Sequence, residues 1–138
     1  MSRVEPFARN PNDGSKRVLV VDDGTTMRLF YRSVLEAAGF VVEEAANGVE
    51  GYEKALAQPF DLMIIDINMP KMDGYSMLRA IRADAAVRAT PAVTISTEAG
   101  DKDVIKAFEA GANFYMVKPV ATRELTEIAC LITGARPQ

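Results

Sequence analysis

Five polar residues of this chain stand at the ends of short apolar runs, where burial next to a core would remove their hydration. They are Asp22, Asp23, Asp66, Ser96 and Lys118. A charged group in such a place needs a metal, a counter-charge or a covalent modification to compensate for lost water. If the fold brings these residues together, the ammonium group could be the counter-charge of the carboxylates, and the carboxylates together could bind a metal.

Three neighbouring carboxylates repel one another unless a cation lies between them. Mg²⁺, a hard cation, binds a few carboxylates together with waters and leaves positions for a phosphate oxygen. Lys118 would add positive charge from the other side, and the Ser96 hydroxyl could donate to an anion between them. This combination suits phosphoryl transfer, which requires positioning and charge stabilisation. Asp66 ends the central apolar run and is the candidate nucleophile, forming an aspartyl phosphate.

Each of these residues also has an ordinary structural interpretation. Asp22 and Asp23 could cap a helix and face solvent. Ser96 could bond to nearby backbone, and Lys118 could be a solvated lysine. Tyr115, an aromatic residue of the last apolar run, could be a core or edge aromatic. Mutual geometry decides between these interpretations and a shared site.

Apolar runs and helical periodicity alternate along the chain. Runs typical of buried strands occur at residues 17–21, 40–45, 62–66, 92–95 and 114–117. Segments with helical spacing follow them at residues 24–38, 49–57, 75–83, 101–110 and from 122 onward. This alternation predicts an α/β fold, a flavodoxin-like doubly wound parallel sheet with strand order 2-1-3-4-5 and five helices. In that order the first and third strands are neighbours, so their acidic ends would meet.

Large apolar residues at helical spacing predict which faces of the helices point inward. In the second and fourth helical segments these residues are Val49, Tyr52, Leu56, Val104, Ile105 and Phe108. Asn47-Gly48 is predicted to be a turn, and Cys130 a buried helix residue.

Composition excludes several function classes. The chain has 138 residues, a net charge of -3, one cysteine and no histidine. Without histidine, Ser-His-Asp and Cys-His catalysis and the usual zinc sites are excluded, so any phosphohistidine donor belongs to another protein. The weak negative charge argues against sequence-independent nucleic-acid binding. The lone cysteine and the lack of a membrane-span or signal pattern favour a cytoplasmic location.

Taken in order, these segments resemble the receiver domain of two-component response regulators, most closely the stand-alone chemotaxis type. The resemblance covers about residues 17–133. It rests on Val20-Val21-Asp22-Asp23, Ile65-Asp66-Ile67-Asn68-Met69-Pro70 with Asp73-Gly74, Ser96, Gly111-Ala112 and Val117-Lys118-Pro119. We expect a flexible tail at residues 1–16 and a receiver domain at residues 17–135.

The resemblance implies that a histidine kinase or phosphotransfer protein phosphorylates Asp66 in a Mg²⁺-dependent reaction. Asp23 and Asp66 would ligate the metal directly, the backbone carbonyl of Asn68 would be a third protein ligand, and Asp22 would act mainly through water. Lys118 would pair with the phosphate, and the Lys118–Pro119 peptide bond would be cis.

The resemblance also implies a switch. Ser96 would move toward the phosphoryl group and Tyr115 would turn inward, which would change the surface formed by the fourth helix, the fifth strand and the fifth helix. Asn68, Glu98 and Thr97 would tune the lifetime of the phosphoryl group, which we expect to be short.

Two positions depart from the family pattern. Gly24 replaces a larger side chain of many relatives and predicts a more open rim of the pocket. Thr97 replaces the usual Ala or Gly and could narrow access to the phosphate or add a hydroxyl contact.

We expect no output domain, and therefore output through contact with an unknown downstream protein. Direct DNA binding and membrane insertion are not expected, nor is enzymatic activity beyond self-catalysed phosphorylation and dephosphorylation. We expect a monomer or a weak phosphorylation-dependent dimer. The alternative is a pseudo-receiver, an interaction module that does not depend on phosphorylation. A flavin-binding protein is disfavoured by the acids after the first strand, and an aspartate-nucleophile phosphatase by Asn68 in place of a second acid.

Overall fold

Five strands and five helices alternate along residues 15–69 and 71–136, the residues that the computed structural model describes. The strands are β1 (Arg17–Val21), β2 (Val41–Ala45), β3 (Leu62–Asp66), β4 (Ala92–Ser96) and β5 (Phe114–Val117). The helices are α1 (Thr25–Ala37), α2 (Gly48–Ala57), α3 (Gly74–Ala83), α4 (Asp101–Ala110) and α5 (Thr122–Thr133). Residues 1–14 of the predicted tail lie outside the described residues, as does Pro70.

The strands form one parallel sheet in the order β2-β1-β3-β4-β5, which confirms the predicted topology. Val21 of β1 pairs with Ile65 of β3. The next residues of these two strands are Asp22 and Asp66, so the register alone brings two of the predicted acids to the same edge of the sheet.

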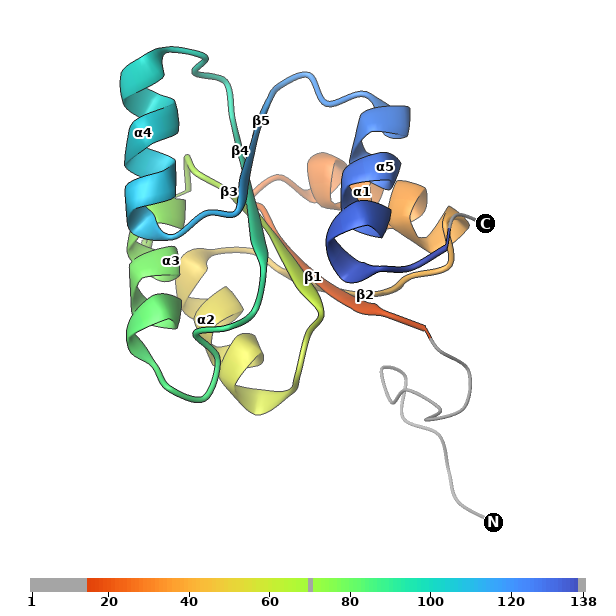
Figure 1. Cartoon of the computed structure of the whole chain (residues 1–138), viewed down its shortest axis with the longest axis horizontal. Helices are drawn as coiled ribbons and strands as arrows, with labels where there is room; N and C mark the ends of the chain where they lie inside the picture. Colours follow the sequence, from red (N-terminus) through yellow and green to blue (C-terminus); the bar gives the residue numbers. More distant parts are fainter. Residues whose placement is uncertain (1–14, 70, 137–138) are drawn as a thin grey trace.

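Helices cover both faces of the sheet, with α1 and α5 on one side and α2, α3 and α4 on the other (Figure 1). Side chains alternate between the two faces along each strand. In β1, Val18 and Val20 join the core under α1 and α5, whereas Leu19 and Val21 join the core under the other three helices. The same alternation decides on which face of the sheet the side chain of each strand-end residue lies.

The inward face of α2 differs from the prediction at Val49 and Leu56, whereas Tyr52 packs against the core as predicted. Its buried residues are Gly48, Gly51 and Ala55, whereas Val49 and Leu56 are 42% and 45% exposed. A Cβ atom at Gly51 would lie 2.9 Å from Met77 Cε, so this helix packs closely through small residues. The predicted turn was also wrong, because Asn47 is the N-cap of α2 and accepts a hydrogen bond from Glu50 N at 2.9 Å.

The inward face of α4 also differs. Ala107 and Ala110 are buried, whereas Ile105 and Phe108 are 56% and 46% exposed. Val104 is partly buried. The spacing of the large apolar residues thus predicted the wrong face of α4, because small residues let this helix lie close to the sheet and α3.

Other local predictions hold. Gly39 and Gly111 end their helices with φ values of 98° and 117°, which glycine adopts readily. Cys130 is a buried residue of α5. Among the described residues, no helix has the length and apolar character needed to cross a membrane.

Candidate functional site

Asp66 lies at the carboxyl end of β3 and is only 3% exposed. Its Oδ1 accepts a hydrogen bond from Asn68 N at 3.2 Å. Gly74, at the start of α3, packs against its backbone, since a Cβ atom at Gly74 would lie 2.5 Å from the Asp66 carbonyl oxygen. The absence of a side chain at Gly74 therefore fixes the loop that follows β3 against the candidate nucleophile.

Three carboxylates meet at this edge of the sheet. Asp22, Asp23 and Asp66 each offer one oxygen, and these oxygens lie within 4.8 Å of one another. Asp22 is buried like Asp66, whereas Asp23 is exposed. Asp22 Oδ1 accepts from Gly24 N at 2.8 Å, while Asp22 Oδ2 is buried and has no hydrogen-bond partner within residues 15–69 and 71–136. Hard oxygen donors in this arrangement, one of them unsatisfied, fit a divalent cation such as Mg²⁺.

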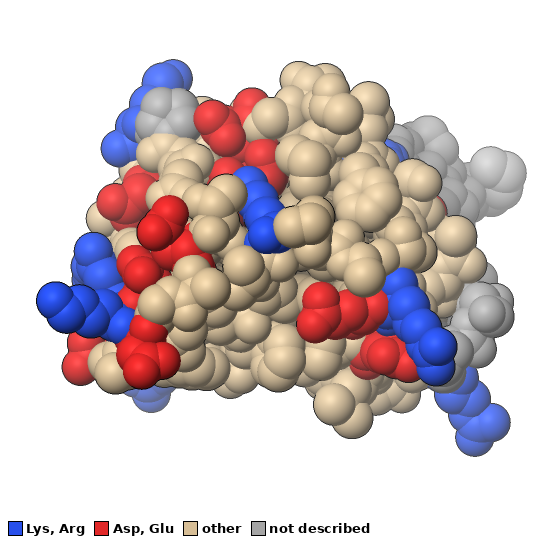
Figure 2. Space-filling view, turned by 90° about the horizontal axis from the view of Figure 1, so that it is seen from above, with Lys and Arg blue, Asp and Glu red and all other residues tan. Residues whose placement is uncertain are grey.

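Lys118 brings positive charge to the same place. Its Nζ lies 3.4 Å from Asp66 Oδ1 and 4.0 Å from Asp22 Oδ2. The Lys118–Pro119 peptide bond is cis, as predicted. The view from above shows acidic and basic side chains lying next to one another between broad uncharged areas (Figure 2).

Burial is the main electrostatic influence on the two inner carboxyl groups. It raises the pKa of Asp66, and the charge of Asp22 raises it further, while Lys118 and the Asn68 amide act in the opposite direction. Burial likewise raises the pKa of Asp22 against the lowering effects of Gly24 N–H and Lys118. One lysine does not compensate for two desolvated carboxylates, so the site favours the binding of further positive charge.

The family model described as response regulator receiver domain matches residues 18–129. The chain belongs to the response regulator receiver domain family. The resemblance stated from the sequence is thereby confirmed.

Relatives of this receiver domain include chemotaxis proteins. It is 38% identical over 120 residues to chemotaxis protein CheY1 of Helicobacter pylori, covering 86% of this chain and 97% of that protein. It is similar to the structure of chemotaxis protein CheY4 of Vibrio cholerae, with a TM-score of 0.82, 32% identity and coverage of 86% and 99%.

One structural neighbour holds the expected metal. The receiver domain of a sensor histidine kinase from Pseudomonas aeruginosa PAO1 was crystallised with a magnesium ion coordinated in its active-site cleft. The similarity to this chain has a TM-score of 0.81 with 29% identity and covers 88% of this chain and 99% of that one.

A chain of hydrogen bonds leads from the site of this receiver domain toward β5. Ser96, at the end of β4, is buried, and its Oγ accepts from Glu98 N at 3.0 Å. The Tyr115 hydroxyl donates to the carbonyl oxygen of Glu98 at 2.6 Å. The two predicted switch residues therefore bond to the same residue of the loop between β4 and α4.

The remaining predicted residues line the rim. Asn68 and Glu98 are exposed, and so is Thr97, whose hydroxyl donates to Glu98 Oε2 at 3.3 Å. A Cβ atom at Gly24 would lie 3.3 Å from Asp22 Oδ1, so a larger side chain there would crowd this carboxylate.

Sequence reasoning missed residues that hold the site from outside. Arg28 of α1 donates to the backbone oxygen of Asp22 at 2.8 Å and to Glu44 Oε1 at 3.0 Å. Its position one turn into the helix after Asp23 could have suggested this contact.

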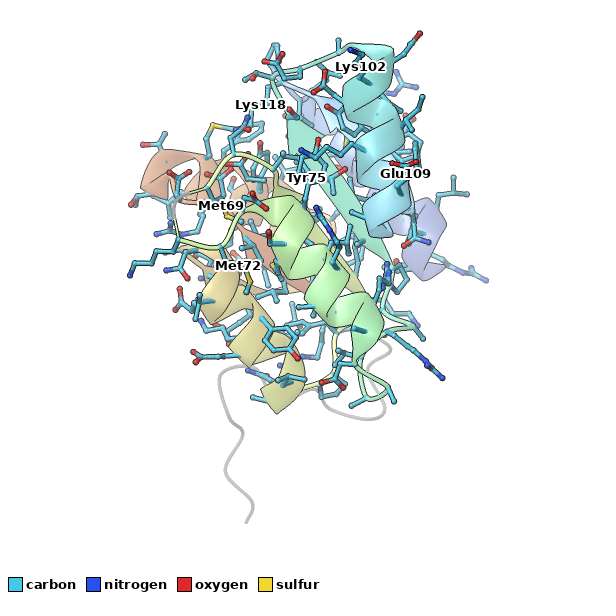
Figure 3. The ribbon with its side chains drawn as sticks, turned by 90° about the vertical axis from the view of Figure 1, so that its left-hand side faces the viewer. Met69, Met72, Tyr75, Lys102, Glu109 and Lys118 are labelled. Atoms are coloured by element: carbon cyan, nitrogen blue, oxygen red, sulfur yellow. The ribbon has the colours of Figure 1, made fainter. Side chains whose placement is uncertain are left out.

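Tyr75, at the start of α3, joins this helix to α4 and was also missed. Its side chain lies beside α4 (Figure 3), with its hydroxyl donating to the Asp103 carbonyl oxygen at 3.4 Å. Lys106 Nζ lies 4.5 Å from the centre of the Tyr75 ring. From the sequence, Tyr75 is predicted only to begin the helical segment at residues 75–83.

Proposed function

We propose that this receiver domain accepts a phosphoryl group from a histidine kinase, or from a phosphotransfer protein, on Asp66. The observation that carries the proposal is the placement of Lys118 Nζ 3.4 Å from a buried carboxylate that also belongs to a cluster of three acids. A buried aspartate without a partner would destabilise the fold. Asp66 instead lies beside the Lys118 ammonium group and two further acids, which are groups that phosphoryl transfer uses.

In the proposed step, a carboxylate oxygen of Asp66 attacks phosphorus. The phosphorus–nitrogen bond of the donor phosphohistidine breaks, and its electron pair leaves on the imidazole nitrogen. Lys118 would hold one phosphoryl oxygen by charge. The Ser96 hydroxyl, which already accepts from Glu98 N, keeps its own proton to donate to another oxygen.

The acidic cluster would bind Mg²⁺ for this step. Asp23, Asp66 and the backbone carbonyl of Asn68 would be its protein ligands, with Asp22 acting mainly through water. The metal would supply positive charge to the transferring phosphoryl oxygens.

The output would be a change of the surface formed by α4, β5 and α5. The bonds from Ser96 and Tyr115 to Glu98 support this, since they tie both switch residues to the loop that leads into α4. This surface already exposes large apolar side chains, namely Ile105, Phe108, Phe114, Val117 and Leu131. An unknown downstream protein would bind there, in the cytoplasm and without direct DNA binding. Self-association, where it occurs, would be weak and would follow phosphorylation.

Phosphoryl lifetime would depend on the rim residues. Asn68, Glu98 and Thr97 are exposed residues that follow Asp66 and Ser96 in the chain, and they would control the access of water to the phosphoryl group. A short lifetime is expected, because these side chains are exposed and leave water free to approach them.

Radiolabelled phosphotransfer from histidine kinases of the source organism tests the proposal. The wild type should become labelled in Mg²⁺ but not when excess EDTA is present from the start. Asp66→Asn should not become labelled, whereas Asp101→Asn, which changes an exposed acid of α4, should become labelled normally. Label on Asp66→Asn equal to that on the wild type would refute the acceptor assignment.

Beryllofluoride with Mg²⁺ should shift amide resonances of α4 and β5, whereas a pseudo-receiver would show no change.

A further inference from the structure

Tyr31 carries a hydroxyl that the core around it does not use. It lies on the inward face of α1 and is 1% exposed. Its oxygen is buried without a hydrogen-bond partner among residues 15–69 and 71–136. An unsatisfied buried polar group costs about 1–3 kcal/mol, and phenylalanine would fill the same space without this cost.

The core that contains Tyr31 leads up to the acidic site. Tyr31 belongs to the core that contains alternate residues of three strands, namely Val18, Val20, Leu62, Ile64 and Met116. The next residues on the same face are Asp22, Asp66 and Lys118. The ladder continues that far, since Asp22 N donates to Ala45 O at 3.1 Å and Lys118 N donates to Ser96 O at 2.8 Å.

A matching acceptor exists on this face. Asp22 Oδ2 is buried and, like the Tyr31 hydroxyl, lacks a hydrogen-bond partner in the described part of the chain. Lys118 Nζ lies 4.0 Å from this oxygen, beyond hydrogen-bond distance. Burial, together with the charges of Asp22 and Asp66, raises the pKa of Tyr31, so the phenol keeps the proton that it would donate.

We infer that Tyr31 is the inner positioning residue of the acidic site, and that on binding of a divalent cation its hydroxyl donates a hydrogen bond to Asp22 Oδ2 and so holds this carboxylate toward the cation. Tyr31 acts through Asp22 and does not touch the cation or the phosphoryl group. Residues that orient ligands from behind commonly change metal affinity about 10–100-fold when removed. The inference rests on the proposed function, because it requires the cation site.

Calorimetric Mg²⁺ titration of the metal-free protein tests it with a matched pair of variants. Tyr31→Phe removes the hydroxyl and keeps the ring, and we expect it to weaken Mg²⁺ binding about tenfold. Tyr52→Phe is the control. Tyr52 lies on α2, and its hydroxyl donates to Asp84 Oδ2, at the end of α3, at 3.2 Å. The Mg²⁺ affinity of Tyr52→Phe should therefore equal that of the wild type.

A second measurement needs only the wild-type protein. The ¹³Cζ resonance of Tyr31 reports the hydrogen bond of its hydroxyl, and it should shift during the Mg²⁺ titration with the same midpoint as the calorimetric curve. Mg²⁺ affinity unchanged in Tyr31→Phe, or a Tyr31 resonance that does not move at saturation, would overturn the inference while wild-type Mg²⁺ binding leaves the proposed function intact. Failure of the wild type to bind Mg²⁺ would overturn both.

Discussion

At the residue scale, the two inner carboxylates are poised to bind positive charge. Asp22 and Asp66 are almost fully buried, and burial is the largest cause of their raised pKa. Without a cation, the folded state therefore holds protons on these groups more tightly than the unfolded chain does. The free energy of unfolding must then fall as pH rises through the raised pKa and recover as pH falls toward the ordinary value of 3.8.

Asp66→Asn should accordingly stabilise the metal-free protein at pH 7, by on the order of 1–2 kcal/mol. The gain should shrink as the pH is lowered toward 4, because the wild-type carboxylate then becomes neutral as well. Urea unfolding in EDTA at several pH values measures it. Glu53→Gln, an exposed change on α2, is the control, and an equal pH dependence of both variants would contradict this explanation. Mg²⁺ should raise the melting temperature of the wild type more than that of Asp66→Asn.

Lys71 is strained by its backbone. Its φ is 66°, in the left-handed region, where a residue with a Cβ atom costs about 1 kcal/mol or more. Lys71→Gly should therefore be about 1 kcal/mol more stable than Lys71→Ala, which keeps the Cβ and also removes the charge. Denaturant unfolding of the two variants compares them directly, and equal stability would show that the loop relaxes without cost.

At the element scale, the strands could be predicted and the helix faces only in part. A strand buried on both faces gives a short apolar run with a polar end, and parallel topology collects these ends at one edge. From this pattern, the positions of Asp22, Asp66 and Lys118 at strand ends could be predicted correctly. The faces of α2 and α4 could not be found this way, because Gly51 and Ala107 are too small to appear in a pattern of large apolar residues.

Tyr31 and Arg28 could not be predicted for a similar reason. Tyr31 matched the apolar spacing of α1, so its hydroxyl carried no separate signal. Arg28 contacts a backbone oxygen, which any residue could supply. Such support depends on how α1 is rotated against β1, and one-dimensional spacing does not fix this rotation to the accuracy of a hydrogen bond.

The rotation of α4 can be tested by a matched pair of substitutions. Ala107→Leu would place a larger side chain in a fully buried position, which should cost about 1–3 kcal/mol. Phe108→Gln on the exposed face should change stability by less than about 0.5 kcal/mol. Chemical denaturation measures both. The opposite ranking would mean that α4 packs by its large apolar residues after all.

At the scale of the whole molecule, the acidic site and the main cross-link of the α3–α4 side lie at opposite edges of the sheet. Arg82, near the end of α3, donates to the backbone oxygens of Gly111, Arg88 and Thr90. It also donates to Asn113 Oδ1, which accepts from Ala92 N as well. One guanidinium thus joins α3 to the starts of β4 and β5, while the site occupies the other ends of these strands.

Loss of this cross-link should reduce stability without disturbing the site. Burial disfavours the charged guanidinium of Arg82 and lowers its pKa. The planar guanidinium nevertheless donates to several backbone oxygens, which would lose these hydrogen bonds in its absence. Arg82→Met should therefore cost about 2–4 kcal/mol, and Arg82→Lys, which keeps the charge but not the fork, should recover only part of this. Arg79→Met, an exposed change on the same helix, should be nearly neutral.

Two readouts separate the edges of the sheet. Amide exchange in Arg82→Met should accelerate around residues 88–92 and 111–114, where the lost bonds lie, and remain slow in β1 and the amino-terminal half of α1. Below its melting temperature this variant should still bind Mg²⁺ with wild-type affinity, because Asp22, Asp23 and Asp66 are held by β1, β3 and α1. A loss of Mg²⁺ affinity equal to the loss of stability would mean that the two edges are coupled through the strands, which the separate hydrogen-bond networks argue against.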